Sequence, residues 1–119
     1  MQKIMLKSKL HRASVTDVLI DYEGSIEIDE DLMDQAGISI HEQVHVFNIN
    51  NGNRFITYAI PGKRGEQAIS INGAAAHLAK INDRIIIVAY GIINDDHGNM
   101  SPRILVLDEN NQIISKKGV

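Results

Sequence analysis

One serine follows a glycine in a polar segment, Asp21-Tyr22-Glu23-Gly24-Ser25, and could react with its own backbone. The Ser25 hydroxyl can attack the Gly24 carbonyl, so that an ester replaces the peptide bond. Base-assisted elimination then releases the upstream chain and leaves dehydroalanine, which loses ammonia to become a pyruvoyl group. Glycine suits this position because it tolerates backbone conformations that other residues resist. The commoner meaning of Glu-Gly-Ser is an ordinary turn, and the pair by itself fits both interpretations.

Two polar side chains line up on the strand expected at residues 55–60. Arg54, Ile56 and Tyr58 are two residues apart, so they share one face of a strand. A guanidinium is the usual clamp for a carboxylate, and a phenol can donate a proton. The alternative is an exposed arginine that merely follows a turn.

Two further segments combine polar groups with an expected change of structure. Alternation places Lys9 and His11 on one strand face and Leu10 and Arg12 on the other, which a solvated strand edge would also explain. The segment from Asn72 to residue 76 could begin a helix with Asn72 as N-cap. The same geometry would offer free backbone N–H groups to an anion, with room left by the small side chains.

A third pattern, His41-Glu42-Gln43-Val44-His45, matches the HExxH motif of zinc proteases. That chemistry needs a helix, whereas this motif runs into β-branched residues and a hairpin. On a strand the two histidines would stand roughly 13 Å apart, at about 3.3 Å per residue. Zinc–nitrogen bonds are only about 2 Å long, so we expect no metal site.

The elements that must position these residues are mostly short strands. We expect a long strand with a weak point over about 3–20, strands at 25–28, 44–49, 55–60, 68–71, 84–90 and 104–107, and a hairpin turn at 50–53. Asp29 should cap a short helix that Gly37 ends, and residues 74–79 should form a helical turn. We expect residues 61–65 to form a loop and the polar end, 115–118, to be disordered. This pattern favours a mainly β fold, a closed or nearly closed barrel.

Composition restricts the class of protein. The chain has 119 residues, 44% of them hydrophobic, and a net charge of −3, which suits one domain over residues 1–119. The absence of a basic block argues against nucleic acid, and no run is long enough to span a membrane. With no cysteine and no signal peptide, the expected location is the cytoplasm.

Taken together, five segments of the sequence resemble the aspartate 1-decarboxylase family, whose pyruvoyl-dependent members make β-alanine for pantothenate synthesis. They follow the family's order and spacing over most of residues 5–93, whereas the tail after about Asp95 matches poorly. The matching segments are Lys9-Leu10-His11-Arg12, Tyr22-Glu23-Gly24-Ser25, Asn51-Gly52-Asn53-Arg54-Phe55, Thr57-Tyr58-Ala59-Ile60 and Ser70-Ile71-Asn72-Gly73-Ala74-Ala75-Ala76-His77.

The resemblance implies a double-psi β-barrel with short helices, assembled as a homotetramer with active sites at subunit interfaces. It implies autocatalytic cleavage between Gly24 and Ser25, a covalent pyruvoyl cofactor derived from Ser25, and neither metal nor pyridoxal phosphate. L-aspartate would form a Schiff base with that group, and Tyr58 would be the proton donor after CO₂ leaves. The implied substrate-binding residues are Lys9, Arg54, Thr57, Asn72, Gly73, Ala74 and Ala75, with His11 and Tyr22 in support. Thr57 would also assist processing.

Alternatives remain open at this point. Residues 37–46 look superficially like the helix-to-strand passage of swapped-hairpin transcription regulators, although those need a basic face. An inactive precursor, or a pyruvoyl enzyme for another amino acid, would carry the same motifs. Processing could be spontaneous or could need a maturation factor.

Overall fold

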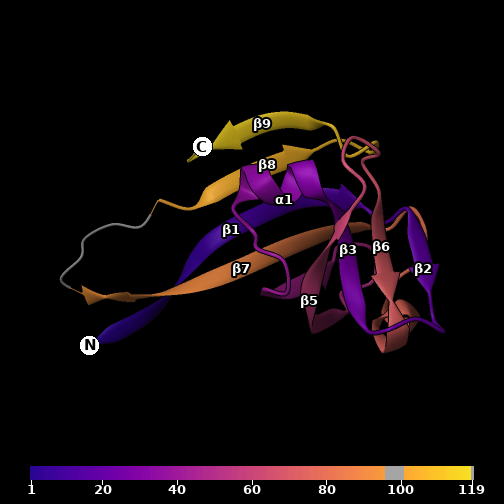
Figure 1. The fold of residues 1–119 in the computed structure, drawn as a ribbon, viewed down its shortest axis with the longest axis horizontal. Helices are drawn as coiled ribbons and strands as arrows, with labels where there is room; N and C mark the ends of the chain where they lie inside the picture. Colours follow the sequence, from indigo (N-terminus) through magenta and orange to yellow (C-terminus); the bar gives the residue numbers. More distant parts are fainter. Residues whose placement is uncertain (96–100, 119) are drawn as a thin grey trace.

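The computed structural model describes residues 1–95 and 101–118, in which nine strands form one mixed sheet (Figure 1). Its order is β2-β6-β3-β5-β4-β7-β1-β8-β9, so β2 and β9 are its edges. The strands are β1 (Gln2–Ser14), β2 (Asp17–Leu19), β3 (Ser25–Asp29), β4 (Gln43–Asn48), β5 (Arg54–Gly62), β6 (Ile69–Asn72), β7 (Arg84–Asn94), β8 (Arg103–Leu107) and β9 (Ile113–Lys117). This confirms the mainly β fold, and the mixed sheet is consistent with a double-psi β-barrel, although its strand order does not close.

Isoleucines at alternate positions of β3, β6 and β7 make up much of the core, and those of β7 are Ile85 and Ile87. In the antiparallel pair of β3 and β6, Ile26 lies beside Ile71 and Ile28 lies beside Ile69. All four side chains are fully buried. Since burying an isoleucine stabilises the fold by roughly 1.5–3 kcal/mol, this pair of strands is firmly held. The same strands carry Ser25 at their end, so the core fixes the backbone around that serine.

The first strand is broken where we expected one weak point in a continuous strand. β1 pairs with β7 and β8, whereas β2 lies across the sheet beside β6. Arg12 has φ of 64° at a bulge, which leaves Leu10 buried but Arg12 exposed. The prediction that Leu10 and Arg12 share a face is therefore wrong, because the bulge interrupts the alternation.

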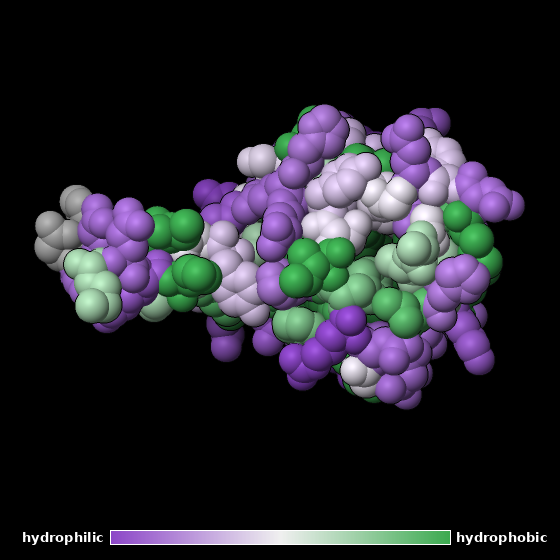
Figure 2. Space-filling view, turned by 90° about the horizontal axis from the view of Figure 1, so that it is seen from below, coloured by the Kyte–Doolittle hydropathy of each residue, from purple (hydrophilic) through white to green (hydrophobic). Residues whose placement is uncertain are grey.

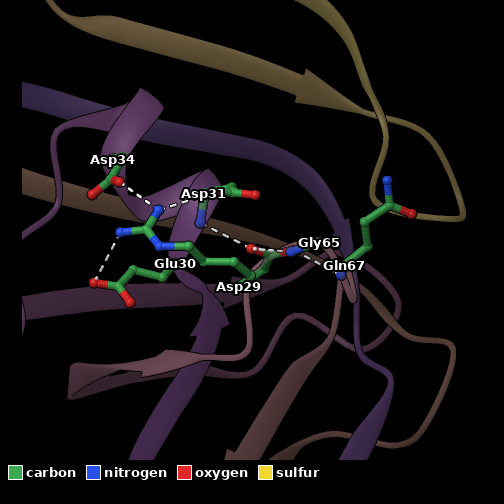
Figure 3. A network of polar contacts seen from close by, with 7 residues as sticks. Asp29, Glu30, Asp31, Asp34, Gly65 and Gln67 are labelled. Carbon is green, nitrogen blue, oxygen red and sulfur yellow. Dashed lines mark hydrogen bonds and ion pairs between the residues drawn. The ribbon is translucent and has the colours of Figure 1, made fainter.

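The helix capped by Asp29 is confirmed. α1 (Glu30–Ala36) begins where the Asp29 carboxylate accepts from the Asp31 backbone N–H at 2.9 Å, and it ends at Gly37 with φ of 75°. The same carboxylate accepts from the backbone N–H groups of Gly65, at 3.1 Å, and Gln67, at 2.7 Å (Figure 3). One buried side chain thus ties the β5–β6 loop to the start of the helix.

The predicted hairpin is confirmed and is longer than its apolar runs. β4 and β5 pair from Gln43 with Tyr58 to Phe47 with Arg54, around a turn in which Gly52 has φ of 78°. β5 continues through Pro61 to Gly62, so the loop predicted over residues 61–65 begins later than expected. This extension pairs with β3 in parallel, so it depends on a contact that the local sequence does not encode.

The C-terminal end is ordered by β9, so the expectation of disorder at 115–118 is wrong. β9 pairs with β8, and buried Leu105 and Leu107 of β8 join the core. The Asn111 side chain is also buried, accepting from the Ser14 backbone N–H at 2.7 Å and donating to the Ser14 carbonyl at 3.0 Å. Residues 96–100 and 119 of the expected tail lie outside the described residues.

Candidate functional site

Ser25 is buried at the start of β3, with only 1% of its surface exposed. Its Oγ donates to the Glu23 carbonyl at 3.2 Å and accepts from the Asn72 side-chain amide, also at 3.2 Å. Asn72 is the β6 residue paired with Ser25 in the antiparallel ladder. The hydroxyl that follows Gly24 is therefore held from both sides, away from bulk water.

Asn72 occupies the N-cap position of η1, a 3-10 helix over Gly73–Leu78, but its side chain makes no capping hydrogen bond. The amide nitrogen Nδ2 points to Ser25, and the amide oxygen Oδ1 accepts from Ser70 Oγ at 2.8 Å. Asn72, Ser70 and Ser25 are all at most 5% exposed. The N-cap interpretation is thus wrong for this side chain, because its hydrogen bonds join β6 to the serine.

Gly73 lies directly against the segment that contains Gly24. Its φ is 75°, and a Cβ built on it would fall 2.6 Å from Gly24 Cα and 3.0 Å from the Tyr22 carbonyl oxygen. Only glycine fits here, because a real Cβ does not approach another heavy atom so closely. Gly24 itself has no neighbour within 4 Å of an added Cβ, so the crowding comes from the Gly73 side.

The remaining predicted residues near this cluster lie on its borders. Ala74 and Ala75 form the first turn of η1, with Ala74 exposed and Ala75 half-buried. Tyr22, upstream of Gly24, is 54% exposed. Thr57 is half-buried on β5 opposite Val44, two residues before Ala59, which pairs with Ile26. β3, which begins at Ser25, therefore runs beside β5, which carries Thr57.

Arg54 and Tyr58 share one face of β5, as predicted, and that face is exposed. The Arg54 guanidinium lies over the Phe47 ring, 4.7 Å from its centroid, and this contact orients the guanidinium group. The Tyr58 ring packs edge-on against His41, with 6.1 Å between ring centroids. Both polar groups face outward, so a ligand that they share would have to bind on the surface of the sheet.

Lys9 and His11 lie on β1, away from β5 in the sheet. Cross-strand pairing runs from Lys9 to Val88, then to His45, then to Ile56, which places Lys9 three strands from β5, or about 14 Å along the sheet. Burial lowers the pKa of His11, and the positive charges of Lys9, Arg12 and Arg84 lower it further. Its Nδ1 is buried with no hydrogen-bond partner among the described residues.

The HExxH pattern is not helical, as its neighbours predicted. His41 lies in a turn with φ of 70°, and His45 lies on β4. Within residues 1–95 and 101–118, no three side chains of His, Cys, Asp or Glu gather as a metal site would require. The helices of the described chain are also all too short or too polar to cross a membrane.

The chain thus brings predicted residues together in two groups, one around Ser25 and one on the outer face of β5, whereas Lys9 and His11 on β1 lie apart from both. Ser70 belongs to the first group and was not predicted. The signal was present, because Ser70 and Asn72 are two residues apart on one strand and so share a face. That a serine would orient the asparagine amide could not be read from spacing alone.

The fold and this cluster define a small β-sheet protein with a buried serine held beside the peptide bond that precedes it. The chain belongs to the aspartate decarboxylase family, whose model matches residues 1–114. An aspartate 1-decarboxylase of Halorhodospira halophila is 51% identical over 119 residues, covering 99% of this chain and 94% of that protein. One from Thermoanaerobacter pseudethanolicus is 52% identical over 116 residues, covering 97% and 99%, respectively. This family membership identifies the chain as a carboxy-lyase relative rather than a transcription regulator.

Proposed function

We propose that this protein decarboxylates L-aspartate to β-alanine and CO₂, a step that supplies pantothenate and coenzyme A synthesis. The observation that carries the proposal is the pair of hydrogen bonds on the buried Ser25 hydroxyl, from Asn72 and to Glu23. Identity of about 50% to aspartate 1-decarboxylases over nearly the whole chain supports the substrate. A guanidinium on the same protein, at Arg54, suits a dicarboxylic substrate.

The cofactor in this proposal is a pyruvoyl group made from Ser25. Oγ attacks the Gly24 carbonyl carbon, the C–N bond breaks and an ester forms, leaving the Ser25 nitrogen as a free amine. Loss of the Ser25 Cα proton then breaks the Cβ–Oγ bond, which releases a Gly24 carboxylate, and water replaces the nitrogen as ammonia. The residues present fit this group, because Asn72 Nδ2 donates to the Oγ that departs with the carboxylate. When formed, the group supplies an electron sink for decarboxylation.

The side chains of this protein then bind the substrate and move the proton. Arg54 would hold a substrate carboxylate through two parallel hydrogen bonds, lowering the entropic part of the barrier. The Tyr58 hydroxyl would deliver the proton to Cα after CO₂ leaves. Backbone N–H groups of residues 73–75 and the side chains of Lys9, Thr57 and Tyr22 would complete the pocket, with His11 in support.

A homotetramer with active sites between subunits is part of the proposal. In one chain Lys9 is separated from β3 by β7, β4 and β5 in the strand order. Apolar side chains are also exposed on β1, β7 and β5, where the exposed fractions are 73% for Ile4, 68% for Ile92 and 61% for Ile56. Figure 2 shows apolar side chains on the narrow end of the molecule and in patches over its lower face, where subunits could pack. We place the enzyme in the cytoplasm, with processing either spontaneous or helped by a maturation factor.

The first test is the denatured intact mass of the purified protein. We expect one fragment ending at Gly24 and a second one lighter, by one ammonia, than a chain beginning with Ser25. Purified processed protein should then release CO₂ from L-aspartate and form β-alanine. A chain that stays intact on warm incubation and shows no turnover would overturn the proposal, whereas processing with turnover of another amino acid would correct only the substrate.

A further inference from the structure

Ser70 is the only hydrogen-bond partner of the Asn72 side-chain oxygen in residues 1–95 and 101–118. Ser70 Oγ lies 2.8 Å from Asn72 Oδ1, and Asn72 Nδ2 lies 3.2 Å from Ser25 Oγ. Ser70 is 5% exposed and Asn72 is 1% exposed, so bulk water does not compete for either group. The Asn72 amide is therefore oriented by protein groups alone.

The three side chains form a chain of donors that runs in one direction. Ser70 O–H donates to Asn72, Asn72 N–H donates to Ser25, and Ser25 O–H donates to the Glu23 carbonyl. A hydroxyl has one proton to donate, and an amide has a donor end and an acceptor end. Once Ser70 supplies a donor to Oδ1, the NH₂ end must face Ser25. If the amide were reversed, the Ser70 hydroxyl would lose its acceptor. A buried donor without a partner destabilises the folded protein, so the reversed orientation is disfavoured.

The direction of this chain matters to the chemistry at Ser25. In the ester, Oγ is bonded to the Gly24 carbonyl carbon, and in the elimination it takes the electron pair of the Cβ–Oγ bond. An N–H donor at Oγ stabilises that developing negative charge, whereas a carbonyl oxygen at the same place would repel it. A reversed Asn72 would also draw the Ser25 proton away from Glu23, and so would change the direction in which the nucleophile presents its lone pairs.

From this geometry we infer that Ser70 is a positioning residue for self-processing, which fixes the Asn72 amide with its NH₂ end toward Ser25. The inference deepens the proposed function and rests on it, since it concerns the cleavage between Gly24 and Ser25. Ser70 touches neither of these two residues through a hydrogen bond, and its effect passes through Asn72.

The experiment measures the cleavage rate of freshly purified, uncleaved precursor by denatured intact mass. We expect Ser70→Ala to slow cleavage about tenfold or more and Ser70→Thr, which keeps the hydroxyl, to restore most of the rate. The matched control is Ser14→Ala, because Ser14 is 4% exposed and its Oγ has no partner in the described part of the chain. That variant should cleave like the parent protein.

A double-mutant cycle separates orientation of the amide from a general loss of packing. If Ser70 acts through Asn72, adding Ser70→Ala to Asn72→Ala should change the cleavage rate by less than about twofold. Equal slowing by the alanine and threonine variants, a parental rate for Ser70→Ala, or a further tenfold loss in the Asn72→Ala background would each overturn the inference. A parent chain that never cleaves would instead refute the proposed function, so the two failures are distinguishable.

Discussion

Gly73 is packed so closely against Gly24 that no side chain fits at position 73. A Cβ on Gly73 would lie 2.6 Å from Gly24 Cα and 2.8 Å from Gly24 N. The two glycines come from segments 49 residues apart in sequence, and both flank the Ser25–Asn72 contact. Under the proposed function Ser25 attacks the Gly24 carbonyl, so we expect the position of Gly73 to affect processing as well as later binding of substrate.

We therefore expect Gly73→Ala to slow cleavage between Gly24 and Ser25 by at least tenfold. The added methyl must displace Gly24. A shift of about 1 Å in a reacting group can lower the reaction rate a hundredfold. Gly52→Ala is the matched control, because Gly52 also has a positive φ, 78°, but nothing lies within 4 Å of an added Cβ. Both variants carry a backbone strain of roughly 1–2 kcal/mol. Equal cleavage rates for the two, measured by intact mass, would contradict a role for the contact.

Tyr58→Phe should leave processing intact and lower kcat for β-alanine formation by about a hundredfold or more. The variant keeps the ring that packs on His41 and removes only the hydroxyl that would donate the proton. The measurement is steady-state turnover per processed subunit, with the fraction processed taken from intact mass. A variant with the parental kcat would remove Tyr58 from the role of proton donor.

Arg54→Ala should raise KM for L-aspartate strongly, by about tenfold or more, with normal cleavage at Gly24. The variant loses the fork that lies over Phe47, and with it the bidentate contact to a carboxylate. Arg54→Lys tests whether charge suffices, because lysine keeps the charge but lacks the planar fork. We expect the lysine variant to recover only part of the loss. Unchanged kinetics in the alanine variant would take Arg54 out of the clamp role.

His11 should make the folded state less stable as the pH falls below about 6.5. Because burial and neighbouring positive charges lower its pKa in the folded protein, the unfolded chain binds protons more readily in that range. The stability that neutral His11 permits is present above about pH 6.5 and is lost as the pH falls through the lowered pKa. His11→Gln should therefore show a smaller fall in Tm between pH 7 and pH 5. Parallel Tm–pH curves for the variant and the parent would contradict this.

Asn111→Ala should lower the free energy of unfolding by about 3 kcal/mol. The buried side chain joins Ser14 to the β8–β9 turn and also donates to the Gln67 carbonyl at 2.9 Å. The control is Asn110→Ala, since Asn110 is exposed and its side chain makes no hydrogen bond within residues 1–95 and 101–118, where its backbone N–H donates to Asp108. Urea unfolding at one fixed protein concentration is the measurement, because subunit association would shift the midpoint. Equal midpoints for the two variants would show that the turn is not held by Asn111.

Features that depend on neighbours in sequence could be predicted, and the start of α1 is the clearest example. Asp29 before Glu30 and Asp31, with Gly37 seven residues after Glu30, satisfies the rules for both helix ends, and the structure follows them. The hairpin of β4 and β5 is similar, because its turn residues and apolar runs are adjacent. In both cases the hydrogen bonds that decide the structure close within a few residues.

Features that depend on distant partners were missed, and β2, β9 and Asn72 show why. β2 separates from β1 because it pairs with β6, and β9 is ordered by β8 although its own sequence is polar. Asn72 looks like an N-cap locally, but its amide bonds instead to Ser25, 47 residues away. No pattern within a short window carries the position of a partner that folding brings from elsewhere in the chain.

The sequence by itself determined the chemical groups of this protein: a serine after a glycine, an arginine and a tyrosine on one strand face, and the segments that mark its family. Only the tertiary structure decided which of them meet. It set Ser25 beside Asn72, brought Ser70 to the Asn72 amide and pressed Gly73 against Gly24. The physical reason is that residue type fixes what a group can donate or accept, whereas the register of paired strands fixes where it stands.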